Sequence, residues 1–265
     1  MSDYQALAEK ALRDEPLTRA ECLHVLGTPD ERLLELLDAG FTVRERYFGR
    51  KVRLQLLQNA KSGACQEDCH YCSQSAVSTA DIDRYGLLPM EQMVDGARRA
   101  AAARAQRYCI VISGRSPLDR EIAEISDAVR AIKRELPIQV CCSLGLLNQD
   151  QARELRAAGV DRINHNLNTS PVPGTPLEHC DHLTPQRCLK VLCLFRFLHP
   201  RTEIRMAGGR EFNLRTLQPL ALYVADSLFV GGYLTTPGQP APEAWKMITD
   251  LGFEIEVDYR QPVAK

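Results

Sequence analysis

The sequence predicts an α/β protein: a TIM-type (β/α) barrel that is incomplete and follows an N-terminal helical cap. The chain has 265 residues, 45% of them hydrophobic, which is enough for one such barrel. From Val52 onward, short apolar or β-branched runs alternate with helical patterns, as in βα units around a parallel sheet. Only six such runs occur, whereas a closed barrel needs eight strands. We therefore expect a cap over residues 1–48 and a barrel domain over 49–265.

The cap is expected to contain three short helices. The first covers residues 4–12, the second is capped by Thr18, and the third covers 30–48. Thr18 and Glu21 have the spacing of a capping box. Leucine stripes without clustered polar groups indicate that this segment only packs against the barrel.

The barrel elements are expected in a regular order along the chain. Strands are predicted near 51–58, 107–113, 138–144, 162–167, 203–207 and 227–231. Helices are predicted near 89–105, 119–135, 148–158, 184–198 and 213–224, with 241–251 closing the chain.

Charge and composition exclude several classes of function. The chain has 33 Lys and Arg against 34 Asp and Glu, so no overall field favours nucleic acid or an anionic membrane. It has no basic region followed by an apolar run at its start, and no apolar run long enough to cross a membrane. Ten cysteines without a secretory signal indicate a reducing compartment, where thiols serve metals or catalysis. A cytoplasmic protein with a small-molecule substrate is expected.

Three of these cysteines form a C-x3-C-x2-C motif directly after the first predicted strand: Cys65, Cys69 and Cys72. Three such thiolates can hold three irons of a cubane cluster and leave the fourth iron open for chemistry. The alternatives are a zinc-binding structural module and buried cysteines that simply pack as small apolar residues. For zinc, a fourth ligand is needed, and His70 would strain the loop in reaching the same ion.

Two more cysteines lie in predicted strands. Residues two apart in a strand share a face, so Arg107 and Cys109 point the same way, and Cys141 can meet them from the next strand. Cys142 would then face the helix layer. Ordinary burial is the alternative for Cys109 and Cys141.

Polar groups end the later strands. Asn164, His165, Asn166 and Asn168 end the fourth strand, where barrel enzymes keep site residues, although asparagines also cap turns. Arg205 and Arg210 flank a pair of glycines, and an ion pair with Glu211 is the alternative role for Arg210. The remaining cysteines have no ligand spacing and are interpreted as structural: Cys22, Cys180, Cys188 and Cys193.

The segment 61–75, KSGACQEDCHYCSQS, resembles the cluster loop of radical S-adenosylmethionine enzymes, and specifically of the biotin synthase family. Further matches to this family occur in order at 107–109, 141–145, 164–170, 173–178, 207–211 and 231–236. These matches extend over nearly the whole chain.

The resemblance implies a four-iron four-sulfur (4Fe-4S) cluster on Cys65, Cys69 and Cys72, whose open iron takes the amino and carboxylate groups of S-adenosylmethionine. It places Tyr71 beside the adenine and Asn168 at the ribose. Asn166 would contact both this cofactor and the substrate, dethiobiotin.

The resemblance further implies an auxiliary two-iron two-sulfur (2Fe-2S) cluster that donates sulfur. Cys109, Cys141 and Arg205 match three of its ligands. The implied reaction inserts sulfur between C6 and C9 of dethiobiotin and gives biotin. A flavodoxin or ferredoxin would supply electrons, and the enzyme would be a homodimer without nucleic-acid or membrane partners.

The match to the family breaks after residue 170. Members of the family have two more strand–helix units there, about 60–70 residues in all. That segment brings the third cysteine of the auxiliary cluster, a glycine-rich strand and a second asparagine for dethiobiotin. Three hypotheses follow: a biotin synthase, a paralog that binds iron–sulfur and S-adenosylmethionine with impaired or no sulfur insertion, and a zinc-binding structural module.

Overall fold

The computed structural model describes residues 2–63, 65–164, 172–179 and 183–257. The chain forms two compact units. The first unit contains Met1–Leu54, Leu183–Gly231 and Gly238–Glu256; the second contains Gln55–His182, Gly232–Pro237 and Val257–Lys265.

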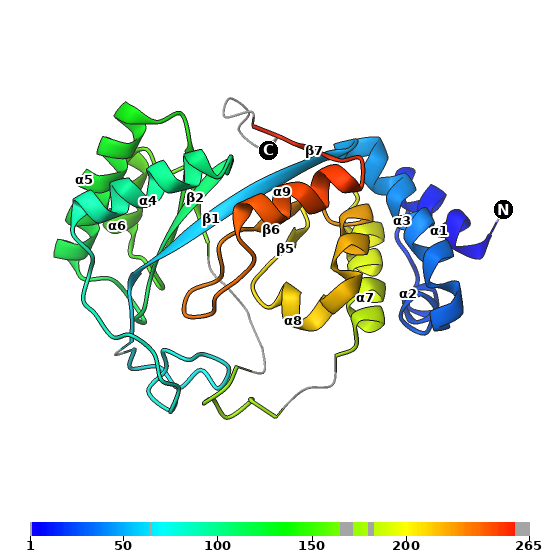
Figure 1. Ribbon diagram of the computed structural model, residues 1–265, viewed down its shortest axis with the longest axis horizontal. Coiled ribbons are helices and arrows are strands. Elements are labelled where there is room, and N and C mark those ends of the chain that lie inside the picture. The colour runs from blue at the N-terminus through cyan, green and yellow to red at the C-terminus, as the bar shows by residue number, and fades with distance from the viewer. Residues whose placement is uncertain (1, 64, 165–171, 180–182, 258–265) are drawn as a thin grey trace. The chain divides into compact units, whose positions relative to one another are not determined.

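A parallel sheet is the framework of the molecule (Figure 1). Its strands follow the order β4-β3-β2-β1-β6-β5, and β7 pairs with β1. Their bounds are Lys51–Lys61 (β1), Arg107–Ile112 (β2), Gln139–Ser143 (β3), Arg162–Ile163 (β4), Arg205–Met206 (β5), Ser227–Phe229 (β6) and Glu254–Ile255 (β7). β4 and β5 are consecutive strands along the chain, but they stand at the two opposite ends of this strand order and do not pair with each other. The sheet is therefore not closed, and the predicted incomplete barrel is confirmed.

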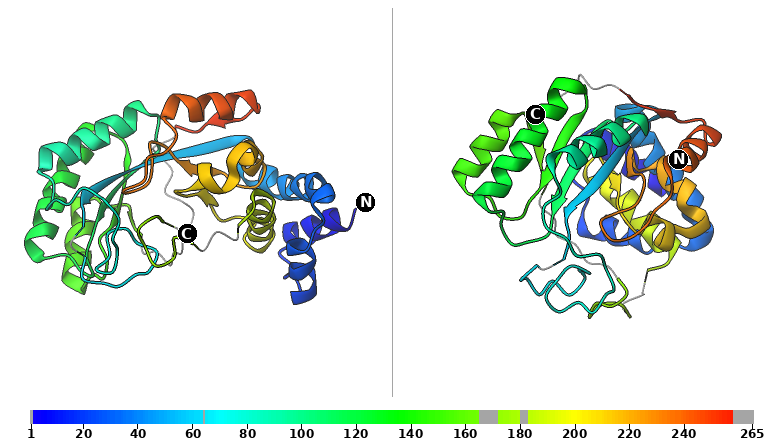
Figure 2. Two further views of the ribbon diagram at one scale, coloured as in Figure 1. Left: turned by 60° about the horizontal axis from the view of Figure 1, so that its bottom comes forward. Right: turned by 60° about the vertical axis from the view of Figure 1, so that its left-hand side comes forward.

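Three helices cover one face of the strands in the second unit: α4 (Met90–Ala102), α5 (Asp119–Glu135) and α6 (Gln149–Ala158). They lie side by side (Figure 2). Asn148 caps the start of α6, because its side chain accepts a hydrogen bond from the Gln151 amide at 2.9 Å. Gly159 caps its end and takes the left-handed conformation with φ 101°.

The first unit packs helices around α3 (Leu33–Phe48). The expected capping box is present: the Thr18 amide donates to Glu21 Oε2 at 2.6 Å, and the Glu21 amide donates to Thr18 Oγ1 at 3.2 Å. A separate cap over 1–48 stays a prediction. The other elements of this unit are α1 (Asp3–Leu12), α2 (Arg19–Leu26), η1 (Asp30–Arg32), α7 (Pro185–Leu198), α8 (Arg210–Leu214), η2 (Arg215–Tyr223) and α9 (Ala241–Asp250).

Two elements differ from the prediction. The single helix predicted over 213–224 is instead the short α8 followed by the 3-10 helix η2, because Arg215 has φ 50° and Pro219 has no amide hydrogen to donate. The chain also does not end on the helix near 241–251, because β7 follows it. Apolar and charged residues alternate over 253–257, which is the pattern of a strand.

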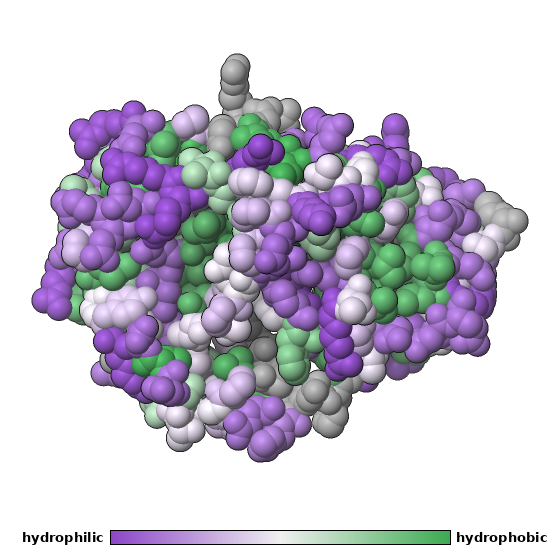
Figure 3. All heavy atoms as spheres, in the orientation of Figure 1, coloured by the Kyte–Doolittle hydropathy of each residue, from purple (hydrophilic) through white to green (hydrophobic). Residues whose placement is uncertain are grey.

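The surface shown in Figure 3 is hydrophilic over α4 and α5 and has an apolar patch over α2 and α7. Exposed large apolar side chains on these two helices are Leu23, Leu26, Phe195 and Leu198. Within the described parts of the chain, no helix is both long and apolar enough to cross a membrane.

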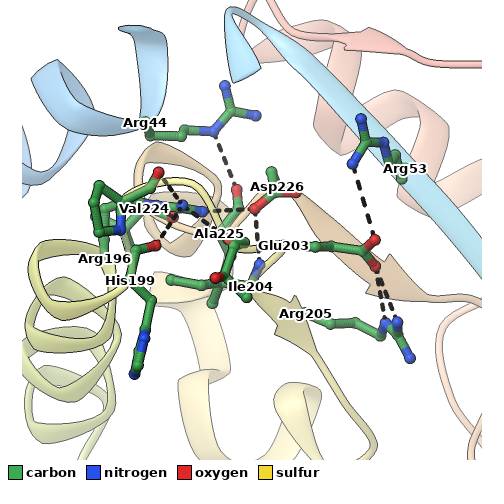
Figure 4. Close-up of polar contacts among 12 residues, drawn as sticks. Arg44, Arg53, Arg196, His199, Glu203, Ile204, Arg205, Val224, Ala225 and Asp226 are labelled. Carbon is green, nitrogen blue, oxygen red and sulfur yellow. Dashed lines mark hydrogen bonds and ion pairs between the residues drawn. The ribbon is translucent and has the colours of Figure 1, made fainter. Parts of the chain in front are cut away.

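A buried ion pair ties α7 to the start of β6 in the first unit (Figure 4). Arg196 Nη2 lies 2.6 Å from Asp226 Oδ1, and both side chains are almost fully buried. The same carboxylate oxygen accepts the Ile204 amide at 2.9 Å. Arg196 also donates to four backbone carbonyls, those of Val224, His199, Pro200 and Thr202. Burial raises the pKa of Asp226 and lowers that of Arg196.

An exposed charge cluster on the first helices leads to a pH prediction. Hydrogen bonding from Arg32 lowers the pKa of Asp3 to about 2, below its ordinary value of 3.8. Because the pKa is lower in the folded state, Asp3 stabilises the fold above its ordinary pKa, and this stabilisation is lost as the pH falls towards 2. We expect Asp3→Asn to lower the thermal unfolding midpoint at pH 6. The difference from wild type should shrink steadily in unfolding scans at lower pH. A difference that stays constant from pH 6 to pH 2 would contradict this role of the carboxylate.

Candidate functional site

The three motif cysteines lie on one closed loop, which we call the cysteine loop (residues 63–84). It leaves the carboxyl end of β1, the end at which barrel enzymes carry their site residues. An antiparallel bridge closes its base: the Ser62 amide donates to the Tyr85 carbonyl at 3.1 Å, and the Tyr85 amide donates back at 3.0 Å.

The start of the loop is fixed to its surroundings by buried contacts. The Gly63 amide donates to Gln74 Oε1 at 3.0 Å, and Ser113 Oγ donates to the Gly63 carbonyl at 2.6 Å. Lys61 Nζ, at the end of β1, lies 2.7 Å from Glu121 Oε1 on α5. The loop thus begins at a strand end that contacts α5, and its first residue is hydrogen-bonded to the residue that follows β2.

The thiols of the loop are reduced, with Cys69 exposed and Cys65 and Cys72 half-buried. Among the described residues, no three cysteine, histidine or carboxylate side chains surround a common point. The thiols are nevertheless close enough to interact electrostatically. Burial, then the charge of Cys65, raises the pKa of Cys69.

Two opposing effects act on the pKa of the Cys72 thiol. Its burial raises the pKa of the thiol, while backbone amides of Gln74 and Ser75 hydrogen-bond the sulfur and act in the opposite direction. Amides directed at a sulfur stabilise a thiolate, and three soft sulfur donors on one loop suit zinc or an iron–sulfur cluster. The chemistry of these donors therefore suits the cluster that the sequence predicts, although the three side chains do not converge on one point.

Two segments from distant parts of the chain contact the cysteine loop. Residues 172–179 contact it through Gly174 and Leu177: the Thr79 amide donates to the Gly174 carbonyl at 2.8 Å, and the Leu177 amide donates to the His70 carbonyl at 3.3 Å. Residues 232–237 contact it through Thr235, whose Oγ1 is 2.6 Å from Ser73 Oγ. Sequence reasoning gave these segments no role, although both carry family motifs.

Cys109 and Cys141 lie next to one another on adjacent strands. Their Cα atoms are partners in the parallel β2–β3 register, and both side chains are buried. Arg107 and Gln139 form the register pair two residues earlier, on the same face of the two strands. Arg107 Nε and Nη2 each lie 3.3 Å from Gln139 Oε1. The structure thus brings together the two strand thiols and places a guanidinium beside them.

The opposite face of these strands looks towards the helices. Tyr108 Oη donates to Gln58 Oε1 at 3.0 Å, and the same oxygen accepts Arg99 of α4 at 3.2 Å. Cys142 lies on this face and is fully buried, which raises its thiol pKa well above the ordinary range. Its position agrees with the expected role in the core.

Arg205 belongs to the first unit, where Glu203 holds it (Figure 4). Its Nη2 and Nε lie 3.0 Å and 3.3 Å from Glu203 Oε1, and its guanidinium carbon lies 5.2 Å from the centre of the Phe229 ring. Glu203 is also 3.9 Å from Arg53.

The other predicted site residues have varied positions. Arg210 forms the ion pair with Glu211 that is the alternative to a site role, and it also donates to Gln218 Oε1 at 2.8 Å. Tyr71 is half-buried in the cysteine loop. The Asn164 amide donates to the Cys142 carbonyl at 2.8 Å. Predicted residues outside the described part of the chain are His165, Asn166, Asn168 and Cys180. The remaining cysteines lie on helices, with Cys193 buried and Cys22 and Cys188 half-buried.

Solved structures with a similar fold include a maturase and a synthase. The [FeFe]-hydrogenase maturase HydG superposes with a TM-score of 0.73 at 14% identity, covering 98% of this chain and 78% of that one. Methylornithine synthase (PylB) superposes with a TM-score of 0.69 at 15% identity, covering 94% of this chain and 97% of that one. These similarities support the fold alone.

Sequence comparison gives closer relatives. A family model, the Biotin and Thiamin Synthesis associated domain, matches residues 163–254. Biotin synthase from Bacillus subtilis (strain 168) is 41% identical over 322 residues, covering 97% of this chain and 96% of the relative. Biotin synthase from Bacillus cytotoxicus is 40% identical over 320 residues, covering 96% of each chain. An alignment of 322 residues with a chain of 265 means that the relative carries a long stretch that this chain lacks. Identity and coverage at these levels show that the chain belongs to the biotin synthase family.

Proposed function

We propose that this chain performs the reaction of its family, the conversion of dethiobiotin to biotin by radical S-adenosylmethionine chemistry. The observation that carries the proposal is the closed loop that presents three reduced thiols at the carboxyl end of β1. Cys65, Cys69 and Cys72 would hold the 4Fe-4S cluster. When bound, this cluster supplies the electron that cleaves S-adenosylmethionine to methionine and a 5′-deoxyadenosyl radical.

The protein's own residues would bind and orient the two small molecules. Tyr71, next to Cys72 in the loop, is proposed to pack against the adenine. Asn166 and Asn168 offer amide donors and acceptors, which suit the ribose hydroxyls and the cyclic urea of dethiobiotin.

Cys109, Cys141 and Arg205 are proposed as ligands of a 2Fe-2S auxiliary cluster that donates the sulfur atom. Support comes from the register that makes the two cysteines direct neighbours on β2 and β3. The third cysteine of the family pattern is missing from this sequence. We expect the auxiliary cluster to be held weakly, since even lost secondary contacts cost about 10–100-fold in metal affinity.

A second candidate function is radical formation with little or no sulfur insertion. The specific observation in its favour is the stretch present in the relatives and missing here, as the length of the alignment shows. This candidate shares the cysteine loop with the first and differs only in the fate of the radical.

Anaerobic reconstitution with iron and sulfide tests both candidates. About four irons per chain would indicate the first cluster alone, and about six would indicate both clusters. A chain that binds no iron would contradict the iron–sulfur proposal. A chain that binds a single zinc instead would favour a structural zinc module. Biotin and 5′-deoxyadenosine, measured separately, distinguish the two enzymatic candidates.

Two partners are also proposed. A flavodoxin or ferredoxin would deliver the electron, and the exposure of Cys69 supports access to the loop from outside. A second copy of the chain would form a homodimer, for which the apolar patch over α2 and α7 is a suitable surface (Figure 3). Sedimentation tests the dimer by comparing the mass of the wild-type chain with that of a Phe195→Ser variant. A cytoplasmic location stays a prediction.

A further inference from the structure

Residues 172–179, which we call the clamp segment, hold the cysteine loop at two points. The Gly174 carbonyl accepts three donors from the loop: the Thr79 amide at 2.8 Å, Thr79 Oγ1 at 3.2 Å and Ser78 Oγ at 3.2 Å. At the second point, the Leu177 amide donates to the His70 carbonyl at 3.3 Å. Along the loop, these two points stand on either side of Cys72.

Hydrogen bonds within the clamp segment stabilise its own turn. The Gly174 amide donates to Glu178 Oε2 at 2.8 Å, and Thr175 Oγ1 donates to the Val172 carbonyl at 2.6 Å. The Glu178 amide donates to the Thr175 carbonyl at 3.0 Å, and Thr175 is only 4% exposed. These short-range bonds stabilise the turn that the segment forms, which favours holding the loop over moving with it.

Gly174 is the tightest point of the contact. Its φ is +75°, and a Cβ atom there would lie 2.5 Å from Ala80 Cα and 2.6 Å from the Ala80 nitrogen. Both atoms belong to the loop backbone, which cannot move aside as a flexible side chain would. Only glycine therefore allows the two backbones to approach this closely.

We infer that the clamp segment is a positioning element for the iron–sulfur cluster, and that it acts by holding the Cys72 half of the cysteine loop in place. Free loop residues lose conformational entropy when their thiolates are fixed on a cluster, whereas a loop that is already ordered loses less. The clamp thus raises the retention of the cluster without supplying a ligand. This inference rests on the proposed function, because it takes the three cysteines as cluster ligands.

The test compares Gly174→Ala with Gly49→Ala in the full chain. Gly49 also has a positive φ, +55°, but no atom lies within 4 Å of its Cβ position, so it tests a substitution at positive φ without the collision. In the protein without metal, we expect faster hydrogen exchange over residues 65–80 only in Gly174→Ala. After anaerobic reconstitution, we expect that variant to lose iron to a chelator about 10–100-fold faster than wild type. Gly49→Ala should match wild type in both measurements.

Unchanged exchange over residues 65–80 in Gly174→Ala would overturn the inference, as would faster exchange with unchanged iron retention. If Gly174→Ala does not fold, the double variant Ser78→Ala/Thr79→Val removes two of the three donors to the Gly174 carbonyl without a collision. The double variant should then show smaller increases in hydrogen exchange over residues 65–80 and in the rate of iron loss. Wild-type values in both measurements would contradict the inference. If the wild-type chain takes up no iron at all, the proposed function fails, and the exchange comparison alone decides whether the segment orders the loop.

Discussion

Cys69→Ala is expected to abolish the cleavage of S-adenosylmethionine. With Cys69 removed, two thiolates remain on the cysteine loop, and two thiolates leave two irons of a cubane without protein ligands. Cys69 is exposed, so the fold should survive the substitution. The measurement is 5′-deoxyadenosine released from reconstituted protein, together with the iron and sulfide content.

The matched control is Cys22→Ala, which removes a half-buried thiol from α2. This variant should keep both its iron content and its cleavage activity. Formation of 5′-deoxyadenosine by Cys69→Ala at the wild-type rate would contradict the assignment of Cys69 as a cluster ligand.

Arg196→Met is expected to cost about 3–5 kcal/mol of unfolding free energy, because it leaves the buried Asp226 carboxylate without its countercharge. The guanidinium lies 2.6 Å from Asp226 Oδ1, and both side chains are at most 1% exposed (Figure 4). The other carboxylate oxygen, Oδ2, has no hydrogen-bond partner among the described residues. The carbonyls that Arg196 satisfies would lose their donor as well, which adds to the cost.

Chemical denaturation of the metal-free protein measures this change. Arg187→Met is the control, since Arg187 lies on the same helix but is exposed, and its loss should change the free energy by less than about 0.5 kcal/mol. A loss below about 1 kcal/mol in Arg196→Met would show that the ion pair contributes little beyond what methionine packing replaces.

Much of the fold could be predicted because it rests on local patterns. The capping box at Thr18 fixes the start of α2, and the apolar periodicity of 119–135 predicts α5 with its observed bounds. Where a single residue overrides the pattern, the prediction is wrong. Pro219 and the positive φ of Arg215 turn an expected helix into α8 and a 3-10 helix.

Part of the site could also be predicted from the sequence. The faces of β2 and β3 follow from the alternation of strand residues, and the register makes Cys109 and Cys141 neighbours as expected. The contact between Gly174 and the cysteine loop joins residues almost a hundred positions apart, so no local pattern reveals it. The contact between the Glu203 carboxylate and Arg205 could not be predicted either, because a charged residue next to a strand is usually solvated.

The most direct test is the formation of 5′-deoxyadenosine by the wild-type chain after anaerobic reconstitution. The assay supplies S-adenosylmethionine, a one-electron reductant and dethiobiotin, and biotin is measured in the same sample. We predict at least one 5′-deoxyadenosine per chain, dependent on the bound iron, with the biotin yield separating full sulfur insertion from radical formation alone. A chain that binds about four irons yet releases no 5′-deoxyadenosine would contradict a radical S-adenosylmethionine enzyme built on Cys65, Cys69 and Cys72.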